Sequence, residues 1–280
     1  YSYPIPQKPR PAGCRLIQKK LIMKNIRLIL FSIGISLLAC GTVNAQQAQT
    51  ALQKARLENG EYLARIGDCI SCHTSDPERP YAGGLPMKSP LGNIYSTNIT
   101  PDKETGIGNY SLNDFAKAVR EGINKSGRRL YPAMPYPSFS IISNEDISDL
   151  YLYFMQGVKP VQQLNHPANI RWPLNMRWPL AAWDAVFTVQ GNYKPDPNQS
   201  REWNRGAYLV QGLGHCGACH SPRGFAFQEK GLNQTSRHYL SGGSLEGWFA
   251  PDLTGSTPYG LQNWTREELV NFLSMGHNKT

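Results

Sequence analysis

The feature that most constrains this chain of 280 residues is a short pattern that occurs twice, at Cys69–His73 and at Cys216–His220. In each copy two cysteines stand three positions apart, and a histidine follows at once. On one helical turn the two thiols can add to the two vinyl groups of a single haem, and the histidine is then directed at the iron. The pattern predicts two covalently attached haem c groups, held by Cys69, Cys72, Cys216 and Cys219, with proximal iron ligands His73 and His220.

Two other kinds of site also use paired cysteines. A zinc ion could take all four thiolates, because zinc prefers four sulfur or nitrogen ligands in a tetrahedron. That alternative does not explain why a histidine follows both pairs. A thioredoxin-like redox pair would need a βαβ pattern around the motif, and neither motif has one. Haem attachment is therefore the favoured interpretation.

Residues 1–45 are interpreted as an upstream extension followed by a signal peptide. Met23 fits an initiator, and after it come a basic stretch, an apolar run over residues 28–39 and a small-residue cleavage site at residues 43–45. The apolar run is too short to span a bilayer permanently. Cys40 leaves open the alternative of a lipid anchor. We expect export to the periplasm.

The net charge of +9 does not indicate a nucleic-acid partner. Residues 1–45 hold seven basic residues and no acidic ones, so the rest of the chain carries 22 basic and 20 acidic residues. A nearly neutral protein offers little attraction to a polyanion. The same leader holds two of the six cysteines, so the haem motifs use the other four and none is left for a disulfide.

The surroundings of the two motifs repeat. Gly60-Glu-Tyr-Leu precedes the first motif and Gly206-Ala-Tyr-Leu precedes the second. At an offset of 154 residues, Asn98-Ile-Thr aligns with Asp252-Leu-Thr, and Gly122 aligns with Gly276. We therefore expect a mainly α fold of tandem duplicated cytochrome c-type helical domains. The predicted boundaries are 1–45 for the extension and signal peptide, 46–157 for the first domain, 158–200 for a Pro- and Trp-rich connector, and 201–280 for a second, incomplete domain.

Helix-start signals support the helical interpretation. A first helix is expected over about residues 50–65, ahead of the first motif. Ser111, Ser143 and Thr265 each stand three residues before an acidic residue and an apolar periodic run, which is the pattern of a helix N-cap. Each of the three is predicted to begin a helix.

A sixth iron ligand is expected for an electron carrier, and Met134 is the candidate for the first haem. It lies in Tyr131-Pro-Ala-Met-Pro-Tyr-Pro, where the prolines restrict the loop at little ordering cost. The alternative is a methionine that fills the core. For the second haem the repeat places a counterpart near position 288, so we expect either a C-terminal truncation at Thr280 or an open sixth position. Arg223 is a candidate partner of a haem propionate, against the alternative of a solvated arginine.

Several stretches resemble one known family, the multihaem cytochrome c subunits of membrane-bound periplasmic dehydrogenases. This family includes the cytochrome subunits of quinoprotein alcohol dehydrogenases and of flavin-dependent gluconate or sorbitol dehydrogenases. The resemblance covers about residue 57 to the end, and its most specific stretches are Ser96–Asp102, Pro132–Tyr136, Trp203–Val210 and Gly214–His220.

The resemblance implies an electron-relay subunit with no catalytic residues of its own. Its partner would be a flavoprotein or quinoprotein dehydrogenase, and its acceptor would be ubiquinone or a terminal oxidase at the periplasmic face of the inner membrane. By the same analogy Cys69, Cys72, His73 and Met134 serve the first haem, and Cys216, Cys219 and His220 serve the second. Members of the family carry three haems, so a third is expected beyond this chain. The alternatives are a dihaem peroxidase, the cytochrome subunit of a terminal oxidase, or a free soluble carrier.

Overall fold

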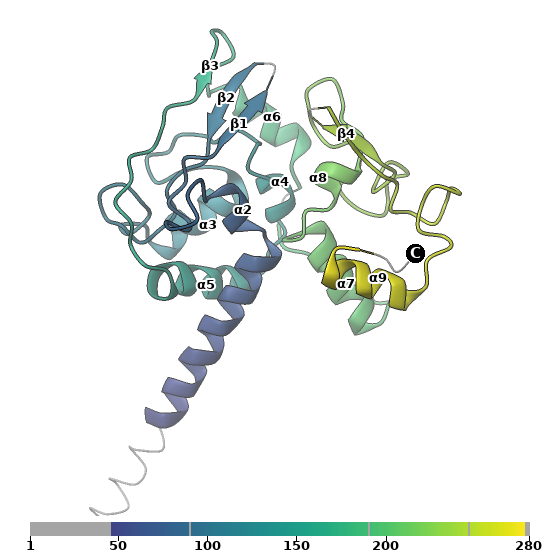
Figure 1. Ribbon diagram of the computed structural model, residues 1–280, viewed down its shortest axis with the longest axis horizontal. Helices are drawn as coiled ribbons and strands as arrows, with labels where there is room; N and C mark the ends of the chain where they lie inside the picture. The colour runs from purple at the N-terminus through teal and green to yellow at the C-terminus, as the bar shows by residue number, and fades with distance from the viewer. Residues whose placement is uncertain (1–45, 90, 190, 246, 278–280) are drawn as a thin grey trace, which may run out of the picture. The chain divides into compact units, whose positions relative to one another are not determined.

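A computed structural model describes residues 46–89, 91–189, 191–245 and 247–277 (Figure 1). The chain divides into two compact units, Tyr1–Ala55 and Arg56–Thr280. In the first unit the described residues, 46–55, are helical and exposed. The predicted signal peptide, its Met23 start and Cys40 lie outside the described residues. Within the described part of the chain, no helix has the length and apolar character to cross a membrane.

The expectation of a mainly α fold is wrong. Only 38% of the structure is helical and 10% is in strands, and a tandem duplication of helical domains is not shown. The strands have two to four residues each, which is too short for their periodicity to stand out in the sequence. The predicted boundaries at residues 157 and 200 stay predictions. In the described residues, five strands form two small sheets: β1 Pro86–Ser89, β2 Gly92–Tyr95, β3 Asn169–Ile170, β4 Gly243–Leu245 and β5 Trp248–Ala250.

The larger sheet joins segments far apart in the sequence. β1 pairs antiparallel with β2, with Met87 opposite Ile94, and β2 pairs antiparallel with β3, with Gly92 opposite Ile170. At Gly92 the backbone has φ 132°, and a Cβ would lie 1.9 Å from the carbonyl oxygen of Asn169. Only glycine permits this close approach. In the smaller sheet β4 pairs antiparallel with β5.

The predicted helix starts are confirmed. Ser111 and Thr265 each form a reciprocal capping box, which satisfies backbone N–H groups at the helix start, and the side chain of Ser143 accepts from the backbone N–H of Asp146. Residues 56–66 are helical at the start of the second unit. The other helices are α2 Cys69–Cys72, α3 Leu112–Glu121, α4 Tyr136–Phe139, α5 Asn144–Leu152, the π-helical η1 Tyr153–Gly157, α6 Leu180–Phe187, α7 Arg201–Gln211, α8 Gly217–His220 and α9 Arg266–Met275.

The core of the second unit gathers apolar side chains from residues 56–66, α3, α4, α5 and η1. The helix at residues 56–66 packs closely on α5, because a Cβ on Gly60 would lie 2.1 Å from the carbonyl oxygen of Asp149. Arg56 fixes the same contact by an ion pair of 2.6 Å to Asp149. The buried cluster contains Leu63, Ala64, Tyr81, Ile107, Phe115, Phe139, Ile142, Ile147, Leu150, Phe154 and Leu213.

Candidate functional site

The first Cys-x-x-Cys-His motif forms one helical turn. Both cysteines lie in α2, and the backbone N–H of His73 donates to the carbonyl of Cys69 at 2.9 Å. Asp68, just before the turn, has a left-handed backbone with φ 49°. Aspartate tolerates this conformation better than most residues. The turn therefore places the two thiols and the imidazole together, as the spacing predicts.

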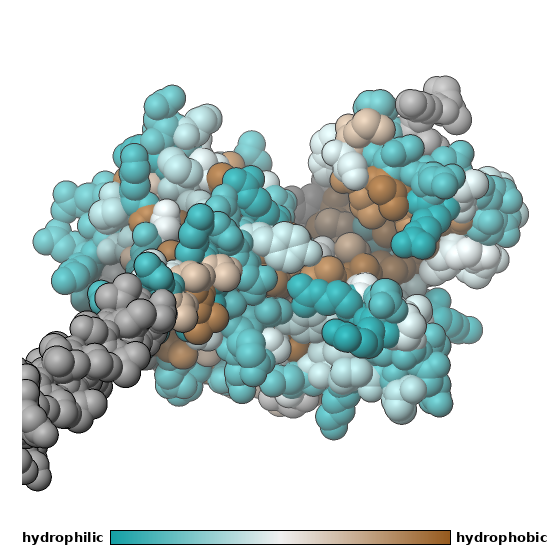
Figure 2. Space-filling model, turned by 90° about the horizontal axis from the view of Figure 1, so that it is seen from below, coloured by the Kyte–Doolittle hydropathy of each residue, from teal (hydrophilic) through white to brown (hydrophobic). Residues whose placement is uncertain are grey.

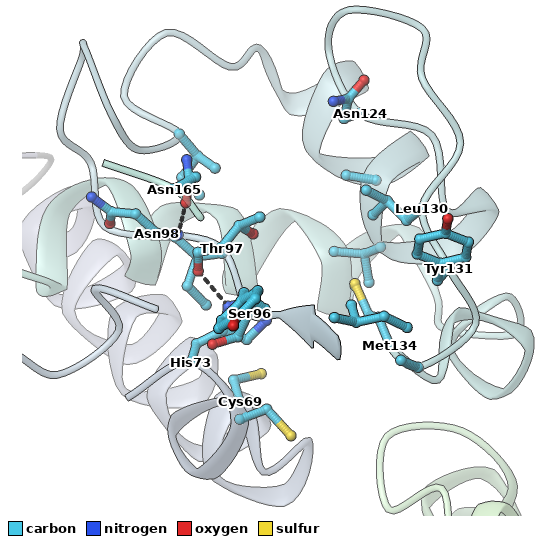
Figure 3. Close-up of a pocket in the computed structure, with 18 of the residues that line it drawn as sticks. Cys69, His73, Ser96, Thr97, Asn98, Asn124, Leu130, Tyr131, Met134 and Asn165 are labelled. Atoms are coloured by element: carbon cyan, nitrogen blue, oxygen red, sulfur yellow. Dashed lines mark hydrogen bonds between the residues drawn. The ribbon is translucent and has the colours of Figure 1, made fainter. Parts of the chain in front are cut away.

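These side chains open into a cavity of about 580 Å³, whose walls are mainly apolar. Its lining includes Cys69, Cys72 and His73 from the motif and Met134 from a loop 61 residues after His73. Figure 3 shows His73 and Met134 on opposite sides of this pocket, with Cys69 at one end. The volume lies in the range of about 300–1,000 Å³ that is usual for organic ligands in proteins. The donor set and the cavity thus fit a haem.

The ring of His73 is held in one orientation. Its Nδ1 lies 2.7 Å from the carbonyl oxygen of Thr97, as the dashed line in Figure 3 shows. A carbonyl accepts only from a protonated nitrogen, so Nδ1 carries the proton and Nε2 keeps its lone pair. Desolvation by the surrounding protein lowers the pKa of His73, although the bond to Thr97 opposes this. The neutral ring is the form that can bind a metal ion.

Met134 is positioned by a tightly bonded loop. Its carbonyl accepts from the backbone N–H of Tyr136 at 2.8 Å, and its own N–H donates to the carbonyl of Tyr131 at 3.3 Å. Tyr136 is 1% exposed and donates through its hydroxyl to Asp184 at 2.6 Å. The loop is therefore anchored at the start of α4. Met87 also lines the cavity, whereas Met155 packs against the core and Met176 is exposed.

Burial changes the acidity of the motif thiols. Desolvation raises the pKa of Cys69 to about 12, with smaller contributions from Asp68 and Cys72. Desolvation also raises the pKa of Cys72, and Asp68 adds to that effect. All four motif cysteines are free of disulfides. Their sulfur atoms are thus not already used in cross-links.

The second motif repeats the local geometry of the first. His215, just before it, has a positive φ of 37°, and the backbone N–H of His220 donates to the carbonyl of Cys216 at 2.9 Å. The Nδ1 of His220 lies 2.8 Å from the carbonyl oxygen of Pro251, so Nε2 is left free here too. Burial raises the pKa of Cys216, and Cys219 is exposed. Met275 is the last residue of α9, as its place in the sequence repeat indicates.

Several residues that line the first cavity were not predicted from the sequence to do so. Leu213 and His215 precede the second motif but line the cavity of the first. The ring of His215 stands edge-on to Phe139 at 5.7 Å, which joins this segment to the first cavity. Arginines from two distant segments line the same cavity: Arg128, Arg129 and Arg177. These arginines are far from the motif in the sequence and belong to no recognisable pattern, so the sequence alone did not place them at the cavity.

Two sequence hypotheses about ligands can be compared with the structure. Arg223 donates to the backbone carbonyls of Ala218 and Phe227, so it fastens the chain around the second motif. Among the described residues, no three side chains of histidine, cysteine, aspartate or glutamate are gathered as a metal site.

Comparison with known proteins gives close relatives. The chain is 51% identical over 250 residues to the gluconate 2-dehydrogenase cytochrome c subunit of Pantoea cypripedii, which covers 88% of this chain and 57% of the relative. It is 49% identical to the cytochrome c subunit of the quinone alcohol dehydrogenase of Gluconobacter oxydans, over 88% of this chain and 51% of the relative. It is 40% identical to the fructose dehydrogenase cytochrome subunit of Gluconobacter japonicus, over 86% of this chain and 50% of the relative. No family model matches.

The chain spans about half the length of the curated relatives that it matches. Identity near one half over most of the chain is far above what unrelated proteins share, and the names of these relatives imply haem c. The resemblance found in the sequence is confirmed. The chain is a homologue of the cytochrome c subunits of gluconate, alcohol and fructose dehydrogenases.

Proposed function

We propose that this chain is an electron-transfer subunit that relays electrons from a dehydrogenase through covalently bound haem c. Cys69 and Cys72 would attach the first haem covalently, and His73 and Met134 would bind its iron. One observation carries the proposal: these four side chains, from segments far apart in the sequence, meet at one mainly apolar cavity. A core-filling methionine would not need to face the pocket that holds the histidine.

The residues of the chain prepare this pocket in three ways. Thr97 fixes the tautomer and direction of the His73 ring, as partners of metal-binding histidines commonly do. The Met134 loop is held by its own backbone bonds and by Tyr136, so little order has to be gained when the thioether binds. Apolar walls exclude water around the iron, which tunes its potential. The bound haem supplies an iron that changes its oxidation state by one electron.

The second motif supports a second haem on Cys216 and Cys219, with His220 as an iron ligand. The support is the geometry shared with the first motif: a single turn, a positive φ before it, and a histidine whose Nδ1 is held by a backbone carbonyl. We propose the regions 46–157 and 201–280 as the two haem-binding parts, joined by the connector 158–200.

The names of the relatives support the proposed dehydrogenase partner. Their names describe cytochrome subunits of gluconate, quinone-dependent alcohol and fructose dehydrogenases. The partner of this chain is accordingly a flavoprotein or quinoprotein dehydrogenase acting on an alcohol, gluconate or a similar polyol or sugar. The electrons pass to ubiquinone or an oxidase at the periplasmic face of the inner membrane, after export by the leader at residues 1–45.

The test begins with the full chain, produced in a bacterium that attaches haem c in its periplasm. The alkaline pyridine spectrum should give two covalent haems per chain, and one in the Cys69→Ala, Cys72→Ala double variant. The oxidised protein should then be reduced within seconds when a gluconate or alcohol dehydrogenase catalytic subunit and its substrate are added, and not with either alone. Absence of covalent haem, or no reduction with any such dehydrogenase, would overturn the proposal.

A further inference from the structure

A cluster of cationic and aromatic side chains stands at one edge of the first cavity. Arg128, Arg129, Tyr131 and Arg177 all line it. The guanidinium of Arg177 lies 3.4 Å from the centre of the Tyr131 ring, and its Nη1 donates to the carbonyl of Arg129 at 2.7 Å. Arg177 belongs to the connector, so two segments meet here.

Arg177 differs from its neighbours in how its charge is balanced. Arg129 forms an ion pair with Asp184, and Arg128 is exposed to solvent. Within the described ranges, no carboxylate lies within ion-pair distance of Arg177. Its Nε is buried and has no hydrogen-bond partner. A buried donor of this kind costs about 1–3 kcal/mol when it stays unpaired, and more when it is charged.

The protein around Arg177 favours an added anion. Burial lowers the pKa of Arg177, and the nearby charge of Arg128 acts in the same direction, although Tyr131 opposes it. Both lowering effects penalise an uncompensated positive charge, so an anion near the Nε would relieve them. A planar guanidinium is suited to a carboxylate because it offers donors in a fixed fork.

One member of the cluster, Arg128, lies at the end of the pocket where haem c would bring its carboxylates, and its charge acts on Arg177. Thioether bonds to Cys69 and Cys72 would hold the vinyl side of a haem, and the two propionates of haem lie on the opposite side of the ring. In Figure 3 Asn124 lies at the end of the pocket away from Cys69. Arg128 stands beside Asn124, because its N–H donates to the Asn124 Oδ1 at 2.8 Å and its carbonyl accepts from the Asn124 N–H at 3.0 Å.

We propose that Arg177 is a positioning residue that binds a propionate of the haem attached at Cys69 and Cys72. This inference rests on the proposed function, since it needs haem in the first cavity. The ion pair would keep the propionate ionised and would tie the connector to the haem. The alternative is a purely structural arginine that joins residues 129–131 to the connector through the contacts already described.

The chain offers a matched control for the experiment. Residues 171–174 and 177–180 both read Arg-Trp-Pro-Leu, so Arg171 occupies the same place in the first copy. Arg171 is exposed and does not line the cavity. Arg171→Gln and Arg177→Gln therefore remove the same charge from the same motif, one outside the pocket and one inside it.

The measurement is the midpoint potential of each haem in the full holo-protein as a function of pH. In the wild type and in Arg171→Gln we expect no dependence of the first haem's potential on pH at mildly acidic pH, because the propionate stays ionised. In Arg177→Gln the propionate should take up a proton in this range, and more readily when the iron is reduced. In Arg177→Gln the midpoint potential of the first haem should therefore be lower than in the wild type at neutral pH, and it should rise as the pH falls.

The outcomes are separable. If covalent haem is absent from the wild type, the proposed function fails. If haem is attached and Arg177→Gln has the same potential and pH profile as Arg171→Gln, Arg177 is structural and this inference fails alone. If the Arg177→Gln protein does not accumulate, the test instead compares the propionate bending bands in the resonance Raman spectra of the wild type and of Arg177→Lys. These bands should shift, because lysine cannot reproduce the planar fork, and identical bands would refute the ion pair.

Discussion

The regions around the two Cys-x-x-Cys-His motifs are nearly alike in local structure. Gly83 donates to the carbonyl of His73 at 2.7 Å, and Gly242 donates to that of His220 at 2.8 Å. Each region also has a capped helix, α3 or α9, that ends at a glycine with positive φ. Interactions between residues close in the sequence account for these hydrogen bonds and helix ends, so the two similar segments share them.

The two regions differ in how this local structure is packed. A Cβ on Gly60 would meet the backbone of α5, whereas one on Gly206 in α7 would meet nothing within 4 Å. Phe115 of α3 is buried, but no residue of α9 is. Hydrophobic side chains open to the surface are visible on the face drawn in Figure 2, and the exposed ones of the second region include Phe225, Trp248, Phe249 and Leu273. Local motif geometry therefore does not by itself produce a packed pocket.

The largest expected effect concerns the two methionines. Met134→Ala should remove the thioether from the iron of the first haem, with loss of that haem's contribution to the near-infrared band that marks methionine-ligated ferric haem and with a lower potential. Met275→Ala, at the end of the exposed α9, should leave both unchanged. Absorption and magnetic circular dichroism spectra of the holo-proteins measure this. An unaltered band in Met134→Ala would remove Met134 from the ligands.

The next prediction compares the two helix glycines. Gly60→Ala should destabilise the holo-protein by roughly 3 kcal/mol, because an overpacked contact to backbone cannot relax without moving a helix. Gly206→Ala has open space and should instead stabilise by about 0.5–1 kcal/mol, the helix preference of alanine over glycine. Denaturant unfolding of both variants gives the two free energies. Effects of equal sign would contradict the difference in packing.

A third prediction uses an acid beside the second motif. Burial raises the pKa of Glu229 from 4.5 to about 7, although Arg223 favours the ionised form. The folded state therefore holds this proton more tightly than the unfolded state. The resulting stability is full below pH 4.5 and is lost as the pH rises toward about 7. After allowance for the partial exposure of the side chain, this change is about 2 kcal/mol.

The glutamine variant removes this pH dependence. Glu229→Gln should be more stable than the wild type at pH values well above neutrality and should show a flatter profile on the acid side. Glu78→Gln, which removes an exposed acid, provides the control. Unfolding midpoints measured across the acid range would decide, and parallel profiles for wild type and Glu229→Gln would show that Glu229 is ionised in the folded protein.

The sequence predicted features that depend on neighbouring residues and missed those that depend on distant ones. The motif turns and the capped helices follow from spacings of a few residues, and they are confirmed. The mainly α class was wrong because strands of two to four residues give no lasting alternation, although Met87 on β1 faces the cavity. Arg177 is far from Arg128 in the sequence, so only the folded chain reveals that the two line one pocket.

The smallest effect tests the capping boxes of α3 and α9, which are chemically equivalent. Ser111→Ala and Thr265→Ala each remove a cap worth about 1 kcal/mol. Because α3 buries Phe115 in the core, its cap should count toward global stability, and Ser111→Ala should lower the free energy of unfolding by that amount. α9 buries no side chain, so the loss in Thr265→Ala should stay local. Hydrogen exchange of the α9 amides should then become about five times faster while the global unfolding midpoint stays unchanged, and a lower midpoint in Thr265→Ala would show that α9 is as well integrated as α3.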